Sequence, residues 1–150
     1  MIILQNQRQY RDTKAQLVGF EKGLIANDAQ DPKDLPPNID PRMLQIMHDA
    51  IASWIETLQE QLEHYEKLRD GLITGREITS LHELPAALIE ARIAARLTQR
   101  QLAKRIGVAE QQIQRWEARN YRGVNLTRLQ EIADALGVQM HDTITYSSAA

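Results

Sequence analysis

The chain has 150 residues, 43% of them hydrophobic, with a net charge of −2 and no cysteine. The lack of cysteine excludes a disulfide framework, a thiolate nucleophile and a cysteine-based zinc site. No apolar run approaches the ~20 residues of a membrane span, and the opening Met-Ile-Ile-Leu lacks the basic start of an export signal. The composition therefore predicts a small cytoplasmic protein of one domain or two small ones, without membrane contact.

The charges are divided unevenly along the chain. Residues 84–136 hold nine Arg and Lys against five acidic residues, whereas residues 1–83 hold nine basic and fourteen acidic ones. A basic segment suits contact with phosphates, and an acidic one is repelled by them. The two halves are therefore expected to have different partners.

Residues 1–75 show the pattern of two amphipathic helices. Apolar or semi-apolar residues recur at three- and four-residue steps in a first stripe of Tyr10, Thr13, Leu17, Phe20 and Leu24. A linker rich in Pro and Asp follows Asn27, and Asp40 before Pro41 has the cap-then-Pro order of a helix start. The second helix has a longer seam: Leu44, Met47, Ile51, Trp54, Leu58, Gln61, Tyr65, Leu68 and Leu72.

A single apolar stripe cannot bury itself, so these two helices need partners. The pattern predicts an antiparallel helical hairpin over residues 1–75 that serves as a dimerisation or partner-binding region. The sequence leaves open whether the helix over 41–71 pairs within the chain or between chains. Residues 76–83 are predicted to be a connector.

Residues 84–138 have the pattern of several short helices. Pro85 suits the first turn of one helix, Thr98 and Gln101 form a Thr-x-x-Gln capping box for the next, and Gly107 suits its left-handed end. In the following helix Val108, Ile113 and Trp116 are expected to point inward. The tail, 139–150, continues an apolar alternation that begins at Val138 and admits a short strand.

This pattern resembles the helix-turn-helix domain of the lambda-repressor/Cro-like, or XRE, family of transcriptional regulators. The matching elements are Thr98-Gln99, Leu102-Ala103, Gly107-Val108, Ile113, Glu117, and the apolar positions of 126–136. The resemblance implies an all-α fold in which a domain of four to five helices follows the hairpin. In this family the residue at Glu117 makes a structural bond, for which Arg96 and Arg105 are the predicted partners.

Two residues depart from the family pattern. Ala109 stands where the family has a Ser or Thr cap for the recognition helix, and a missing cap costs about 1 kcal/mol. Trp116 replaces an aliphatic residue, and its inward position predicts a core role rather than a stacking platform for bases.

The resemblance implies that the helix near 109–117 enters a DNA major groove and that Gln99 contacts a phosphate. A Gln side chain can pair with adenine N6 and N7, and a Glu can accept from cytosine N4. The predicted DNA-binding residues are Thr98, Gln99, Glu110, Gln111, Gln112, Gln114, Arg115, Arg119, Asn120, Tyr121, Arg122, Asn125 and Arg128.

No enzymatic pattern is found. The four histidines, His48, His64, His82 and His141, are scattered without metal-ligand spacing, and there is no phosphate-binding loop or nucleophile elbow. We therefore expect no catalysis, no metal and no cofactor.

Three functional hypotheses follow from the sequence. The first is a transcriptional regulator, a repressor at the nucleoid, that binds double-stranded DNA as a homodimer on a palindromic operator. The second is an antitoxin that represses its own operon and binds a protein toxin through the N-terminal helices. The third is an interaction module whose helix-turn-helix no longer binds DNA.

Overall fold

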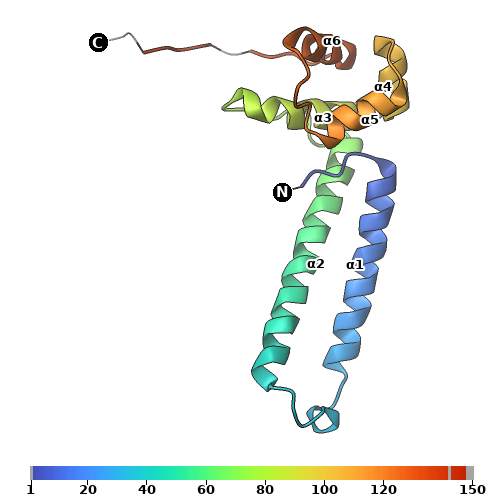
Figure 1. Cartoon of the computed structure of the whole chain (residues 1–150), viewed down its shortest axis with the longest axis vertical. Helices are drawn as coiled ribbons and strands as arrows, with labels where there is room; N and C mark the ends of the chain where they lie inside the picture. Colours follow the sequence, from blue (N-terminus) through green and yellow to red (C-terminus); the bar gives the residue numbers. More distant parts are fainter. Residues whose placement is uncertain (1, 142, 148–150) are drawn as a thin grey trace. The chain divides into compact units, whose positions relative to one another are not determined.

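The computed structural model describes residues 2–141 and 143–147, and the chain divides into two compact units, Met1–Thr74 and Gly75–Ala150 (Figure 1). Every regular element among the described residues is a helix, which confirms the predicted all-α fold. None of these helices combines the length and hydrophobicity that a bilayer span requires.

The first unit is a hairpin of two long antiparallel helices, α1 (Gln7–Asp28) and α2 (Pro41–Arg69) (Figure 1). The linker between them contains one short 3-10 turn, η1 (Pro32–Asp34). Side chains cap both helices: Asn6 accepts a hydrogen bond from the Gln9 backbone, and Asp40 accepts one from the Arg42 backbone. The predicted helix start at Asp40 and Pro41 is confirmed.

Aromatic and polar contacts join the two helices at the end remote from the linker. The rings of Tyr10 and Tyr65 stack with their centroids 5.2 Å apart. The Tyr10 hydroxyl donates a hydrogen bond to the Glu66 carboxylate, and Lys14 and Arg69 place their cations over the Tyr10 ring. Tyr10 therefore anchors α1 to the last turns of α2.

The predicted seam of α2 is partly wrong. Met47 and Trp54 were expected to pack, but their exposed fractions are 52% and 60%, and Leu72, which is 74% exposed, lies beyond the end of α2. Ile55 and Leu62, which that seam omits, are buried. The physical reason is that α2 carries two apolar stripes about a quarter turn apart, and both follow three- and four-residue steps. Only one of them faces α1.

A groove of about 250 Å³ lies between α1 and α2 toward the linker end of the hairpin. Gly19, Phe20 and Gly23 of α1 line one wall, and α2 supplies Met47 and Ile51 to the other. Phe20, which was expected in the packed stripe, is 40% exposed beside this groove. The hairpin is therefore less completely packed here than around Tyr10.

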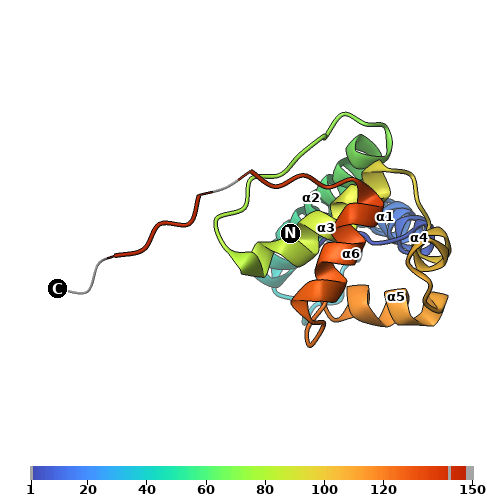
Figure 2. The ribbon, with the colours of Figure 1, turned by 90° about the horizontal axis from the view of Figure 1, so that it is seen from above.

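The second unit begins with a short turn, η2 (Leu81–Glu83), followed by α3 (Leu84–Ala94), α4 (Gln99–Ile106), α5 (Glu110–Ala118) and α6 (Leu126–Leu136). α4 contacts both α5 and α6, and α6 also contacts α3 (Figure 2). The side chains that fill this core are exposed by 1% or less: Leu88, Ile89, Leu102, Ile113 and Ile132. This core fixes the positions of α4 and α5.

The tail forms no strand in its described residues, 139–141 and 143–147, so the short strand that its alternation admitted is not present there. An isolated extended segment has no neighbour to pair with its backbone N–H and C=O groups, so alternation alone cannot make a strand. Asp142 and residues 148–150 lie outside the described residues.

The buried stripe of α2 can be tested by truncation. We expect Leu62→Ala to lower the free energy of unfolding by about 3 kcal/mol, because it leaves a cavity in the hairpin. Leu72→Ala, at a 74% exposed position of the predicted seam that lies beyond the end of α2, should change it by less than about 0.5 kcal/mol. Urea denaturation followed by circular dichroism measures both, and equal losses would contradict the corrected seam.

Candidate nucleic-acid interface

The turn between α4 and α5 is built by local sequence signals. The Thr98 hydroxyl accepts from the Gln101 backbone N–H at 3.1 Å, and the Gln101 side chain accepts from the Thr98 N–H at 2.8 Å. Gly107 ends α4 with φ +71°, a left-handed conformation that glycine adopts at little cost. The predicted capping box and glycine end are confirmed, and Ala109 provides no side-chain cap for α5.

Helix α5 is held by its inner face and leaves its outer face in solvent. Ile113 and Glu117 are fully buried, and Trp116 is half-buried beside Arg128, whose guanidinium lies 5.9 Å from the indole centroid. Trp116 therefore packs less completely than the predicted core role implied. The outer face presents exposed polar side chains: Glu110, Gln111, Gln114 and Arg115, with Gln112 half-buried.

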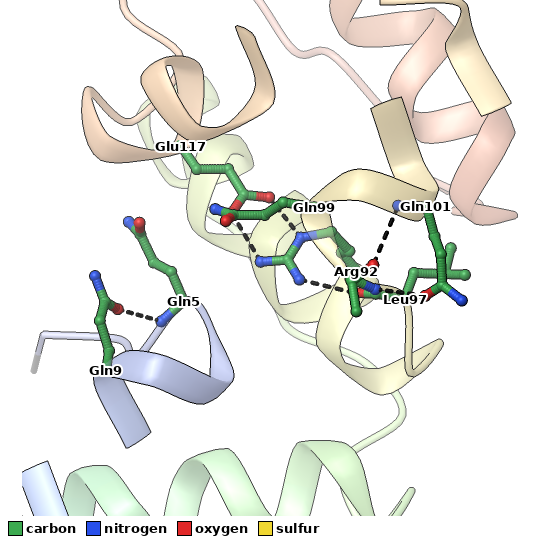
Figure 3. A network of polar contacts seen from close by, with 8 residues as sticks. Gln5, Gln9, Arg92, Leu97, Gln99, Gln101 and Glu117 are labelled. Atoms are coloured by element: carbon green, nitrogen blue, oxygen red, sulfur yellow. Dashed lines mark hydrogen bonds and ion pairs between the residues drawn. The ribbon is translucent and has the colours of Figure 1, made fainter. Parts of the chain in front are cut away.

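A buried polar network connects α5 to α3 and α4 (Figure 3). Arg92 pairs with both carboxylate oxygens of Glu117, from Nε at 2.6 Å and from Nη2 at 2.7 Å. Gln99 Nε2 donates to the same carboxylate at 2.7 Å, and Arg92 Nη1 donates to the Leu97 carbonyl at 2.8 Å. One carboxylate thus joins the last turn of α5 to the end of α3 and the start of α4.

The predicted structural role of Glu117 is confirmed, but its guanidinium partner is Arg92, which is neither of the two predicted residues. Arg105 instead donates to the Ala135 carbonyl at 3.1 Å. The signal that could have identified Arg92 is its place in an otherwise apolar helix face, beside Leu88 and Ile89. A buried charge on such a face requires an opposite charge.

Removing the charge of Glu117 should destabilise the second unit. Glu117→Gln leaves Arg92 buried without its counter-charge, and we expect a loss of about 3 kcal/mol in the free energy of unfolding. Trp116 fluorescence during urea denaturation measures it, with Trp54→Phe removing the other tryptophan. Glu131→Gln is the control, because its ion pair with Arg128 is exposed and should contribute under about 1 kcal/mol. Similar losses in both variants would contradict the role assigned to the network.

The loop between α5 and α6 begins with two strained residues. Asn120 and Tyr121 have φ of 48° and 54°, in the left-handed region that costs non-glycine residues about 1 kcal/mol each. Tyr121 is only 3% exposed, and its hydroxyl meets no hydrogen-bond partner among the described residues. Burial, together with the neighbouring Glu117 carboxylate, raises the pKa of Tyr121 above its ordinary value. The Tyr121 ring therefore supports the loop from inside.

Tyr121→Phe tests this internal role. Because the hydroxyl is buried and unpaired, its removal should leave stability unchanged or raise it by up to about 1 kcal/mol. The raised pKa means that the folded state favours the neutral phenol, so wild-type stability should fall above about pH 10, where the unfolded phenol ionises. Urea denaturation at neutral pH and above pH 10 measures both effects. A loss of stability in the variant at neutral pH would contradict the assignment.

The remaining predicted contact residues lie in two settings. Arg119, Asn120 and Arg122 are exposed in the loop after α5. Asn125 caps α6 by accepting from the Arg128 backbone at 2.8 Å, and the Arg128 side chain pairs with Glu131.

The structure therefore gathers most of the predicted residues on the outer side of α5 and the following loop. Two of them, Gln99 and Tyr121, are buried, and the Gln99 amide already donates to Glu117. Glu110 accepts a 3.3 Å hydrogen bond from Gln114 along the same helix. No group of three or more His, Asp or Glu residues in the described part of the chain could hold a metal ion.

Comparison with known families agrees with this geometry. Residues 88–142 match the model of the helix-turn-helix family, a little over a third of the chain. This segment is therefore a helix-turn-helix domain of the XRE, or lambda-repressor-like, type, and the chain carries the DNA-binding domain of a transcriptional regulator. No curated protein and no solved structure gives a significant match to the chain.

Proposed function

We propose that the protein is a sequence-specific transcriptional repressor that binds a palindromic operator as a dimer, with α5 in the major groove. The observation that carries the proposal is the division of α5 into a buried face and an exposed polar one. Ile113 and Glu117 fix the helix from inside, and Gln111 and Arg115 face solvent. A short helix held rigidly with polar side chains outward is suited to reading base edges.

The proposal divides base reading from backbone contact. Gln111 and Gln112 are suited to pair with adenine, Glu110 with cytosine, and Gln114 and Arg115 with base edges further along the groove. Phosphate contact is assigned to the start of α4 and the α5–α6 region: Thr98, Gln99, Arg119, Asn120, Arg122, Asn125 and Arg128. Because the Gln99 side chain already donates a hydrogen bond to Glu117, we assign its predicted phosphate contact to the backbone N–H at the start of α4.

The test begins with selection of genomic DNA fragments on the purified full-length protein at two salt concentrations. We expect a palindromic motif whose half-sites are centred about 34 Å apart, with affinity that falls steeply as salt rises. Replacing Gln111, Gln112 and Arg115 together by Ala should then lower operator affinity at least about 100-fold, since each good base contact contributes roughly 1–3 kcal/mol of discrimination.

A matched control for the triple variant is Gln130→Ala, an exposed position on α6 whose side chain contacts Asp134. This variant should bind the operator as the wild type does. Unchanged operator binding by the triple variant would refute the assignment of α5, and weak binding without a motif would favour a pure interaction module.

A second candidate function is an antitoxin that represses its own operon and binds a protein toxin through the hairpin. It is favoured by the charge of residues 1–74, which hold twelve acidic and eight basic side chains and would attract a basic partner. A small basic protein that is encoded beside this chain and forms a stable complex with it would support this function. Operator binding alone does not separate the two, because an autoregulating antitoxin also binds DNA.

A further inference from the structure

One face of the hairpin carries no charge although residues 1–74 contain twenty charged side chains. On α1 this face follows three- and four-residue steps through Gln16, Phe20, Gly23 and Asn27. On α2 it follows the same steps through Met43, Met47, Ala50, Trp54, Thr57 and Gln61. Helical periodicity places each series in one row, and the groove lined by Phe20, Gly23, Asn27 and Met47 joins the two rows. We call these two rows the uncharged face.

The part of the α2 row from Met43 to Trp54 is apolar and exposed. Met43, Met47 and Trp54 are 56%, 52% and 60% exposed, and the flanking Ile46 is 64% exposed. Its 4-3-4 spacing is the a/d repeat of a coiled-coil seam, which needs another helix to cover it. α1 does not do so, because it packs against the other stripe, which includes Ile55 and Leu62.

Two glycines widen the face on α1. A Cβ added at Gly19 or Gly23 would meet nothing within 4 Å, so packing within the hairpin does not require either glycine. Glycine inside a helix costs about 1 kcal/mol relative to alanine. The absent side chains leave room for another helix to approach α1 closely.

The uncharged face is complementary to itself. Gly19, Gly23, Met47 and Ile51 line one groove, so these stretches of α1 and α2 lie at the same level along the hairpin. A two-fold axis at that level sets Met47 opposite Ala50 of a second copy, and Trp54 opposite its Met43. Large residues thus meet small or flexible ones, and each match occurs twice.

We infer that the uncharged face binds the same face of a second copy, forming an antiparallel four-helix bundle from two hairpins. This deepens the proposed function, on which it rests only for the biological role of the dimer. The arrangement also brings Arg42 of each copy near the level of Glu56 of the other, on the same flank of the α2 pair. A basic partner would instead need acidic residues on the face, and it has none.

Self-association and binding of a basic protein should depend on salt in opposite ways. Each hairpin unit has four more acidic than basic residues, so two copies repel each other weakly through solvent. Added salt screens this repulsion and should leave self-association unchanged or strengthen it. Binding of a basic protein would weaken with salt.

The experiment is sedimentation equilibrium of the full-length protein without DNA, over a roughly hundredfold range of concentration and at two salt concentrations. The wild type should be a dimer. Met47→Glu, which buries two like charges at the two-fold axis, should weaken dimerisation at least about 100-fold. The matched control is Ile25→Glu, at a 69% exposed position on the opposite side of α1, which should dimerise as the wild type does.

A second variant keeps the test decisive if Met47→Glu fails to fold. Gly23→Leu has open space for its side chain within the hairpin and a better helix propensity, so helix content by circular dichroism should not fall. Dimerisation should still weaken at least about 10-fold, because leucine at this position fills the open space on the uncharged face that a helix of the second copy approaches. A monomeric wild type, or dimers undiminished in the folded variants, would overturn the inference.

A DNA-binding measurement distinguishes a failure of this inference from a failure of the proposed function. Met47→Glu leaves α5 untouched, so it should bind a single half-site as the wild type does but lose the gain in affinity on the palindrome. A dimeric wild type that binds no DNA motif would refute the proposed function alone. Motif binding by a monomeric wild type would refute the dimer, here and in the proposed function, and would leave the assignment of α5 to DNA standing.

Discussion

The second unit depends on a single buried carboxylate. Glu117 is fully buried, and a charge in that position is tolerated only if opposite charge and hydrogen bonds surround it. Arg92 of α3 and Gln99 of α4 provide them. Because the three groups come from three helices, the network is complete only when α3, α4 and α5 are all in place. The outer face of α5 is therefore set by a residue on its inner face.

This constraint also explains how the poorly capped α5 is held in place. α5 has nine residues and no side-chain cap at Ala109, and a helix of that length is marginal in water by itself. Tertiary contacts supply the missing stability, through Ile113 and Glu117. The strained Asn120 and Tyr121 at its far end are held in the same way, by the burial of the Tyr121 ring.

The two apolar stripes of α2 lie in different surroundings. One stripe of α2 packs on α1 and closes the unit, and the other remains outside beside a groove without charged residues. Acidic side chains elsewhere on the hairpin disfavour contact with DNA, while the basic second half favours it. The proposed self-association through the hairpin and the proposed DNA binding through α5 therefore use different parts of the chain.

The sequence by itself determined the features that depend on neighbouring residues. The Thr98 capping box, the glycine end of α4 at Gly107, and the helix start at Asp40 and Pro41 were predicted from local spacing, because caps and turns involve residues a few positions apart. The all-α fold was implied by the family resemblance. Only the tertiary structure decided which apolar stripe of α2 packs and that Arg92 pairs with Glu117. Those choices rest on contacts between residues far apart in the chain, and two stripes with the same periodicity look alike until a second helix covers one of them.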